Sequence, residues 1–449
     1  MRDIEQNLTE GALGKKILLF SLPLMLSNVL QVLFNMADVA VVGQFAGSAA
    51  LGAVGSTTIL VMMFTGILIG MAGGINVLTA MYFGAKNETG VEETVHSAAI
   101  LSLAAGLLLL LFGVGFTKSI LLLMNTKPEL IEGAVLYIRI YFLGMPALAL
   151  YNFGNAVFSA VGDTKRPLRY LSLAGVINIG LNLFFVIVCG MGVAGVALAS
   201  IISQYISAIL IVSALLRCQG AYALRWKKLH LCRDKAAAIL KIGVPSGAQN
   251  AIFQLANLFI QTGVNSFDTV MVAGNSAAAN ADGLVYDIMA AFYTACGSFM
   301  GQNYGAGKKK RVINSFLISL AYSFGIGVTL GLILVIFGKS FLGLFTGDRA
   351  VIEAGMKRLT IMGLSYGVSA FMDCPIAASR ALGRSLLPTV IVIMGSCVFR
   401  VIWVYTVFAY FRTIPSLYLL YVFSWSITAA AEIWYFRRTC REQLRRLDG

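Results

Sequence analysis

A stripe of polar side chains near the start of the sequence ends in a carboxylate. Asn28, Gln31, Asn35 and Asp38 follow one another at intervals of three, four and three residues, which places them on one face of a single helix. Carboxylate and amide oxygens suit hard cations, and a carboxylate among apolar residues can also carry a proton. The stripe therefore predicts a Na⁺ or H⁺ site at Asp38. The alternative is an acid at the end of its helix that reaches water.

The composition indicates that these helices lie in a membrane. Of 449 residues, 58% are hydrophobic and 12% are charged, too few charges to cover a soluble chain of this length. The apolar runs are close to the 20 residues that about 30 Å of hydrocarbon requires of a helix. We expect an all-α integral membrane protein with twelve transmembrane helices, at roughly 17–42, 52–82, 95–116, 130–160, 168–189, 192–216, 237–264, 276–303, 313–337, 352–380, 386–411 and 414–436.

The basic residues indicate the orientation of these spans. With loops assigned alternately to the two sides, 25 of the 34 lysines and arginines fall on one side and five on the other. Cytoplasmic loops carry such an excess, so we expect both termini and the loop 217–241 in the cytoplasm. The net charge of +14 is thus attributed to topology and to contacts with lipid headgroups, and no nucleic-acid partner is expected.

The second half of the sequence repeats landmarks of the first. Leu22-Pro23 recurs as Val244-Pro245 at an offset of 222, and Gly162 recurs as Gly383 at an offset of 221. Each half holds six predicted spans, an even number, so both halves enter the membrane in the same direction. The repeat predicts two pseudo-symmetric six-helix lobes around a central cleft.

The lobe boundaries follow from this repeat. We expect an N-terminal lobe over 1–216, a cytoplasmic linker over 217–236 and a C-terminal lobe over 237–449 with a basic tail. Pro23 lies inside an apolar helix, where it removes a backbone hydrogen bond. It is either a hinge or a static kink.

Polar residues also occur in the other spans. A second stripe runs along the seventh span as Asn250, Gln254, Asn257, Gln261 and Asp268. Its amides either contribute to a site or hydrogen-bond one helix to another. Of the remaining acids at membrane depth, Asp373 is the best second candidate, followed by Asp282, Asp287 and Glu432. Arg400 either pairs with one of these acids or extends toward the membrane surface.

Enzyme chemistry finds little support in the sequence. There are two histidines, both at predicted cytoplasmic ends, and the seven cysteines show no paired spacing, so neither a metal site nor a disulfide framework is predicted. The segment Gly305-Ala306-Gly307-Lys308-Lys309 lacks the first glycine and the Ser/Thr of a phosphate-binding loop. We expect neither an enzyme nor a cofactor.

Four segments together resemble the multidrug and toxic compound extrusion (MATE) family. They are Pro23 with Asn35-Met-Ala-Asp38-Val-Ala-Val-Val-Gly43, Gly162-Asp163-Thr164-Lys165-Arg166-Pro167, Gly192-Val-Ala-Gly195-Val-Ala-Leu-Ala-Ser200, and Gly301-Gln302-Asn303-Tyr304-Gly305-Ala306-Gly307. The resemblance covers essentially the whole chain. It implies a bacterial cytoplasmic-membrane antiporter, acting as a monomer, that exports organic and often cationic compounds in exchange for Na⁺ or H⁺.

The resemblance also implies an ion site in the first lobe. Its residues match Asp38, Asn178, Asn182, Ser200 and Asn155 in this sequence. The second-lobe glutamate of some members is missing, because Gln254 and Asn257 occupy that region.

The remaining residues of interest fall into two groups. A second-lobe polar or substrate site is left open at Asp373, Asn257, Gln254 and Asp287. Flexible and aromatic side chains could line a substrate path, although ordinary packing explains each of them: Met62, Met289, Tyr286 and Tyr293.

Two other functions remain as alternatives to export. A flippase for lipids or lipid-linked oligosaccharides would need a strongly basic cleft, for which Arg400 is the one deep candidate. A channel is disfavoured because the repeat is twofold and no filter-like loop interrupts a span.

Overall fold

The computed structural model describes residues 7–447 except residue 125, and this part of the chain is helical with no strand. The long helices are α1 (Leu13–Val41), α2 (Gly47–Gly84), α3 (Glu88–Leu123), α6 (Lys165–Leu183), α7 (Gly192–Arg217), α8 (Arg233–Val264), α9 (Thr269–Gly305), α10 (Lys309–Leu342), α11 (Arg349–Ala381) and α15 (Ile414–Arg445). Shorter helices are α4 (Pro128–Leu143), α5 (Met145–Ala160), α12 (Leu386–Val392), α13 (Phe399–Trp403) and α14 (Ala409–Phe411).

These helices form twelve successive segments within the described residues, in the order of the twelve predicted spans. Nine are long and apolar enough to cross a membrane, and α4 with α5, bent by 46°, forms a tenth. The helices α8 and α9 are equally long but more polar, since α8 carries the amide stripe and α9 many Asn, Ser, Gly and Ala residues. The prediction of an all-α integral membrane protein is confirmed.

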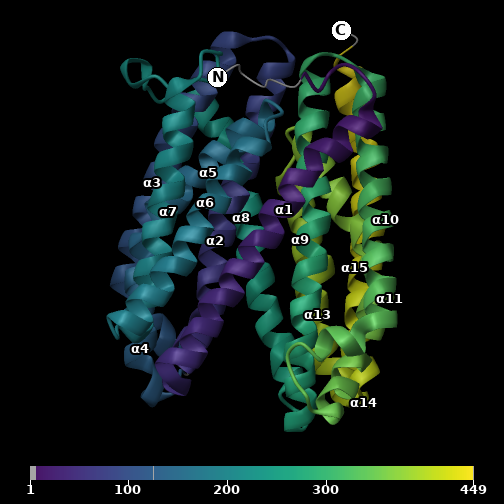
Figure 1. Ribbon diagram of the computed structural model, residues 1–449. Helices are drawn as coiled ribbons and strands as arrows, with labels where there is room; N and C mark the ends of the chain where they lie inside the picture. The colour runs from purple at the N-terminus through teal and green to yellow at the C-terminus, as the bar shows by residue number, and fades with distance from the viewer. Residues whose placement is uncertain (1–6, 125, 448–449) are drawn as a thin grey trace. The chain divides into compact units, whose positions relative to one another are not determined.

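The chain divides into two compact units that share two helices. Unit 1 contains Leu26–Ala251, and unit 2 contains Leu8–Met25 and the chain from Ile252 onward. Both divisions fall inside a helix, in α1 three residues after Pro23 and in α8 seven residues after Pro245. In Figure 1, α1 is the purple helix and α8 a teal one. The first helix of each half therefore begins in one unit and ends in the other, whereas the predicted lobes meet in the linker.

Glycines allow close helix contacts inside each unit. In unit 1, a Cβ atom on Gly70 or Gly74 of α2 would collide with the backbone of α8 at Gly247 or Gly243. In unit 2, Gly331 of α10 lies against the backbone of Gly363 of α11. Small residues let helices approach closely where lipid provides no hydrophobic drive for association. These contacts therefore determine how α2 and α10 pack.

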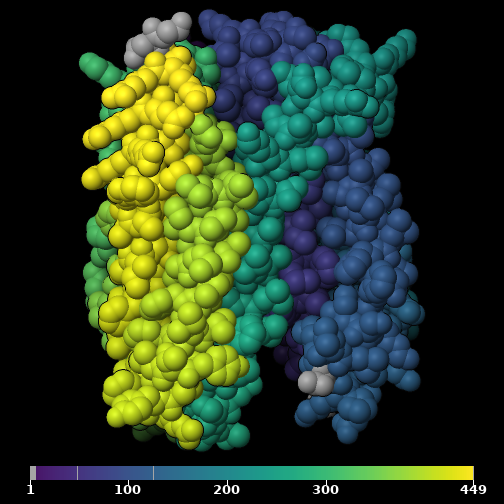
Figure 2. Space-filling model, turned by 180° about the vertical axis from the view of Figure 1, so that it is seen from behind, coloured from purple at the N-terminus to yellow at the C-terminus, as the bar shows by residue number. Residues whose placement is uncertain are grey.

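Leu8 and Gln443, near the two ends of the described residues, lie at the same end of unit 2. The backbone N–H of Leu8 donates to Gln302 Oε1 (3.1 Å) near the end of α9. The Tyr304 hydroxyl, two residues further along, is hydrogen-bonded to the side chain of Gln443 in α15 (3.1 Å). The helix α15 (yellow) and the segment α12–α14 (yellow-green) form the face of unit 2 seen in Figure 2.

The turn before the fifth span of each half has the same geometry. Gly162 and Gly383 both have positive φ, 92° and 77°, which glycine adopts without steric cost. In the first turn, Asp163 Oδ1 accepts from the backbone N–H groups of Lys165 and Arg166, and its other oxygen pairs with Arg166 Nε at 2.8 Å. Burial raises the pKa of the Asp163 carboxyl, although these hydrogen bonds and the charge of Arg166 oppose the change.

Four short segments have π-helical geometry, which is rare and often found at functional sites. Val42–Ala46 follows Asp38 by one turn, and Phe184–Val188 begins two residues after Asn182. In unit 2, Ile393–Val398 and Val404–Phe408 lie on either side of α13. The backbone thus departs from the α-helix next to residues that the sequence singled out.

Candidate ion-binding site

Three helices of unit 1 converge on Asp38. The carboxylate is half-buried near the end of α1. Asn182 Nδ2 on α6 donates to its Oδ1, and Ser200 Oγ on α7 donates to its Oδ2 at 3.2 Å. Neutral donors from two other helices therefore position both oxygens, and three of the predicted site residues lie together.

The amide of Asn182 connects this group to Asn178. The Asn182 side chain is fully buried, and its Nδ2 also donates to Asn178 Oδ1 at 3.3 Å, one turn earlier on α6. The carbonyl oxygen Asn182 Oδ1 is buried without a hydrogen-bond partner among the described residues. A buried acceptor without a donor is costly, whereas a cation would satisfy it. The oxygens of Asp38, Asn178, Asn182 and Ser200 are thus chemically suited to a hard cation.

No basic side chain neutralises Asp38 in the part of the chain that the structure describes: neither an ion pair nor an electrostatic contact with lysine or arginine is found. Buried carboxylates usually have a charged partner, and Asp38 has none among the described residues. The phenols of Tyr137 and Tyr141 on α4 lie within electrostatic range of Asp38, and their rings stack at 5.9 Å. The sequence analysis missed this pair, whose only signal is its i, i+4 spacing.

Other residues of the first-half prediction lie outside this hydrogen-bonded group. Asn155 is half-buried on α5, and no hydrogen bond joins it to Asp38 among the described residues. Gln31 and Asn35 are exposed on α1, and Asn28 is half-buried. The stripe of α1 is therefore not buried along its whole length, and Asp38 is the member that hydrogen-bonds to α6 and α7.

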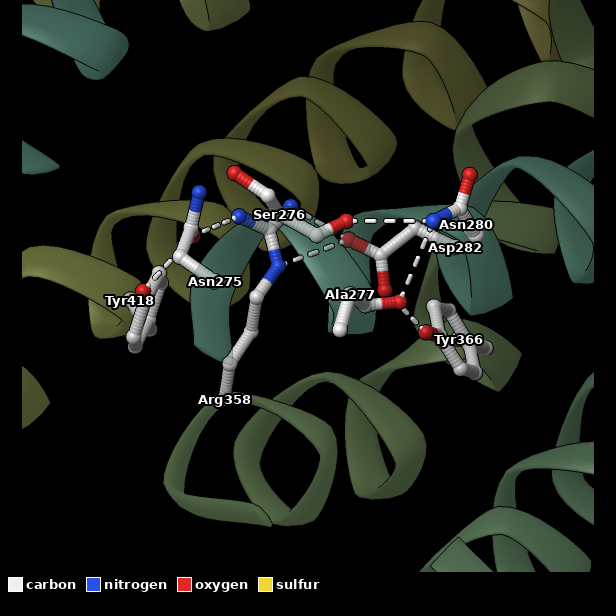
Figure 3. Close-up of polar contacts among 8 residues, drawn as sticks. All are labelled: Asn275, Ser276, Ala277, Asn280, Asp282, Arg358, Tyr366 and Tyr418. Carbon is white, nitrogen blue, oxygen red and sulfur yellow. Dashed lines mark hydrogen bonds and ion pairs between the residues drawn. The ribbon is translucent and has the colours of Figure 1, made fainter. Parts of the chain in front are cut away.

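Unit 2 contains a buried ion pair that the sequence did not identify as one (Figure 3). Arg358 on α11 binds Asp282 on α9 through Nε (3.0 Å) and Nη2, and its Nη1 donates to Asn275. The Tyr366 hydroxyl donates to the second oxygen of Asp282, and Tyr418 donates to Asn275 at 2.7 Å. Both charges are thus paired and hydrogen-bonded, the arrangement that a buried ion pair requires.

A second group of charged residues lies in the core of unit 2. Asp373 and Glu432 are buried, and Glu432 has no hydrogen-bond partner for either oxygen within residues 7–447. Asp373 lies within electrostatic range of Arg380 and Arg400, and Glu432 within range of Arg380. Arg400 is 1% exposed. Its extension toward the membrane surface, one of the two alternatives, is wrong, because the guanidinium is enclosed among aromatic rings and acids of unit 2.

The other residues named for the second lobe are less buried than Asp373. Asn257, Gln254 and Asp287 are half-buried. Of the proposed substrate-lining residues, Met62 and Tyr286 are exposed and Tyr293 is half-buried. Met289 is packed in the unit 2 core and therefore offers no surface in this conformation.

The fold defines a multi-pass helical membrane protein. The MatE family model matches residues 23–184 and again 245–406, so the chain belongs to this family. It is 29% identical over 389 residues to the probable multidrug resistance protein YpnP of Bacillus subtilis, covering 84% of this chain and 85% of that one. It is 24% identical over 373 residues to an FAD transporter of Shewanella oneidensis, covering 82% of each chain.

A solved structure shares the fold. The outward-facing conformation of a multidrug resistance MATE family transporter superimposes with a TM-score of 0.91 over 99% of each chain, at 22% identity. The resemblance recognised from the sequence motifs is confirmed. The protein is a MATE transporter with membrane-spanning helices.

Proposed function

We propose that this protein exports organic, cationic or amphipathic compounds in exchange for Na⁺ or H⁺, and that Asp38 binds the coupling ion. The observation that carries the proposal is a carboxylate in a membrane span with no basic partner in the described chain. An uncompensated charge at membrane depth costs about 2.5–3.5 kcal/mol even on lenient scales. A bound cation or a proton removes this cost, and an ion that enters from outside can do so reversibly.

The surrounding oxygens support either ion. Ser200 and Asn182 hold the two carboxylate oxygens, and the unpartnered Asn182 Oδ1 supplies a further acceptor. Na⁺ would use these oxygens as ligands. A proton would instead neutralise the carboxylate, and the site would retain its neutral hydrogen bonds.

The division of α1 offers a route from ion binding to conformational change. Asp38 lies in the part of α1 that belongs to unit 1, while Leu13–Met25 belongs to unit 2, and Pro23 lies just before the division. An ion shifts a conformational equilibrium only by its differential affinity for the two states. We propose that Asp38 binds the ion more tightly in one arrangement of α1, and that Pro23 permits the change.

The proposed substrates follow from the family, from the exposed apolar side chains and from the burial of two arginines. The exposed side chains of Met62 and Tyr286 provide adaptable apolar contacts. The two deepest arginines, Arg358 and Arg400, are buried within unit 2, so they present no basic surface of the kind that a flippase for anionic lipids would need. A transporter named for multidrug resistance in B. subtilis supports the same choice.

The proposal has a direct test in proteoliposomes loaded with an ethidium-type dye. An imposed Na⁺ or H⁺ gradient should drive dye efflux, and the comparison of the two gradients identifies the ion. Asp38→Asn should abolish the gradient dependence. The matched control is Glu129→Gln, which removes an exposed charge at the start of α4 and should leave efflux intact. Unchanged efflux in Asp38→Asn would refute the assignment of the coupling site.

We also propose that the chain acts as a monomer in the cytoplasmic membrane with both ends in the cytoplasm. The 25-to-5 distribution of basic residues and the position of Leu8 and Gln443 at one end of unit 2 support this orientation. A fluorescent protein fused after Gly449 should fluoresce, and an alkaline phosphatase fused there should be inactive. The reverse result would contradict the orientation.

A further inference from the structure

The same three spans of each half converge on one charged residue, and the two charges have opposite signs. In unit 1 the first, fifth and sixth spans meet at Asp38 through Asn182 and Ser200. In unit 2 the corresponding spans are α8, α12–α14 and α15. There Arg400 on α13 donates from Nε to Ser424 Oγ on α15 at 3.1 Å. Its guanidinium lies 5.0 Å from the ring of Phe253 on α8.

The register of the repeat gives the same correspondence. The two segments that match the family model end at 184 and 406, an offset of 222, whereas the turns at Gly162 and Gly383 differ by 221. The additional residue is accommodated by the π-helical segment Ile393–Val398, since a π-turn contains one residue more than an α-turn. At the larger offset, Asn178 corresponds to Arg400 and Asp38 to Ile260. Unit 2 has thus lost the carboxylate and gained a guanidinium.

Arg400 is enclosed as a bound cation would be. Its guanidinium lies 4.6 Å from the ring of Tyr421 in addition to the contact with Phe253, and aromatic rings at this distance favour a cation. Its Nη2 is buried with no hydrogen-bond partner within the described residues. The nearest acid is Asp373 on α11, within electrostatic range.

The buried ionisable residues around Arg400 include bases as well as acids. Asp373 and Glu432 both lie in electrostatic range of Arg380, and Asp373 also lies in range of Arg400. Asp38 has no such compensation among the residues described. The carboxylate of unit 1 therefore requires a cation from solution, whereas the acids of unit 2 lie beside arginines of the chain itself.

We propose that Arg400 is a chain-borne cation that takes, in unit 2, the place of the exchangeable ion in unit 1. The inference rests on the proposed function of Asp38. It follows that each transporter binds one coupling ion, because a cation that entered unit 2 here would meet a positive charge. Removal of that charge leaves two acids against Arg380, so a second cation-binding site should appear.

The experiment counts ions bound to the purified full-length protein. Equilibrium binding of ²²Na⁺, and proton uptake by calorimetry in two buffers of different ionisation enthalpy, are measured on the wild type and four variants. The variants are Asp38→Asn, Asp38→Asn/Arg400→Gln, Asp38→Asn/Arg400→Lys and Asp38→Asn/Arg400→Gln/Asp373→Asn. The wild type should bind one ion and Asp38→Asn none. Adding Arg400→Gln to Asp38→Asn should restore the binding of one ion. Adding Arg400→Lys, which keeps the positive charge, should restore no ion binding. In the triple variant, Asp373→Asn should remove the site that Arg400→Gln created.

Each outcome decides between the two proposals. A wild type that binds two ions, one of which Asp38→Asn removes, would overturn the inference and leave the role of Asp38 standing. Full ion binding in Asp38→Asn would refute the proposed function instead. A folded Asp38→Asn/Arg400→Gln protein that binds no ion would also overturn the inference. If Arg400→Gln does not fold, the inference is still tested by the number of ions bound to the wild type, expected to be one, and to Asp38→Asn, expected to be none.

Discussion

The side-chain amide of Asn182 on α6 donates to a carboxylate oxygen of Asp38, which lies 144 positions earlier on α1. The same amide carries a carbonyl oxygen that is buried without a partner among the described residues. One residue thus both orients the carboxylate and supplies a vacant acceptor beside it. This combination is better explained by a bound cation than by a purely structural role, because a buried amide with a structural role would have partners for both its N–H and its carbonyl groups.

Replacement of this amide should weaken ion coupling. Asn182→Leu keeps the approximate volume but removes both the donor and the vacant oxygen. A hydrogen bond to a charged group contributes about 1.5–3 kcal/mol, so the ion concentration for half-maximal efflux should rise roughly tenfold or more. The matched control is Asn280→Leu, since Asn280 is exposed on α9 and bonds only within its own helix. Equal ion dependence of the two variants would show that Asn182 does not contact the ion.

The hydroxyl of Ser200 should make a smaller contribution. Its O–H···O bond to Asp38 is 3.2 Å long, longer than the roughly 2.5–3.0 Å that is normal for hydroxyl donors. Ser200→Ala should raise the half-maximal ion concentration roughly threefold, corresponding to the usual net contribution of about 0.5–1.5 kcal/mol. Ser200→Thr retains the hydroxyl and should restore the wild-type value. Efflux measured against a series of ion concentrations distinguishes these variants, and an effect of Thr equal to that of Ala would contradict a role for the hydroxyl.

The sequence predicted the fold well because its signals can be recognised without knowing which helices touch. Apolar runs of membrane length, the basic loops and the recurrence of Pro23 as Pro245 are all visible in the order of the residues. They cannot reveal that α1 and α8 each change unit along their length, since that division depends on packing between distant helices. Of the described helices, α8 and α9 are not among those that length and composition identify as membrane spans.

The sequence predicted those site residues that belong to a recognisable motif and missed those whose role depends only on contacts between distant helices. Asp38, Asn178, Asn182 and Ser200 have polar side chains in apolar spans, which single them out. Tyr137 and Tyr141 are ordinary residues of a membrane helix, and only the structure brings them near Asp38. Arg358 and Asp282 are 76 residues apart, so no periodicity could pair them.

The ion pair between Arg358 and Asp282 should contribute strongly to the stability of unit 2. Removal of one partner leaves the other charge uncompensated, which costs about 3–5 kcal/mol for fully buried pairs. The Asp282 side chain retains 17% exposure, so a value near the lower end, about 3 kcal/mol, is expected. Asp282→Asn and Arg358→Met should each lower the melting temperature of the purified protein.

The double replacement is the control for this pair. Asp282→Leu/Arg358→Met removes both charges and should recover most of the lost stability, because apolar residues often replace a buried ion pair without penalty. Dye efflux by this variant should also remain coupled to the ion gradient, since Asp38 lies in the other unit. A double variant less stable than either single one would show that the surrounding hydrogen bonds of Asn275 and Tyr366, rather than the charges, hold this region together.

The packing of α10 against α11 should tolerate a methyl group at one glycine and not at another. A Cβ on Gly331 would collide with the backbone carbonyl of Gly363, whereas a Cβ on Gly325 of the same helix would meet nothing within 4 Å. Since backbone on both sides prevents relief by a rotamer change, Gly331→Ala should destabilise unit 2 by about 1–3 kcal/mol, as overpacking does. Gly325→Ala should be neutral or slightly stabilising. Melting curves of the two variants measured in the same detergent test this contact, and an equal effect at both positions would contradict the close approach of the two helices.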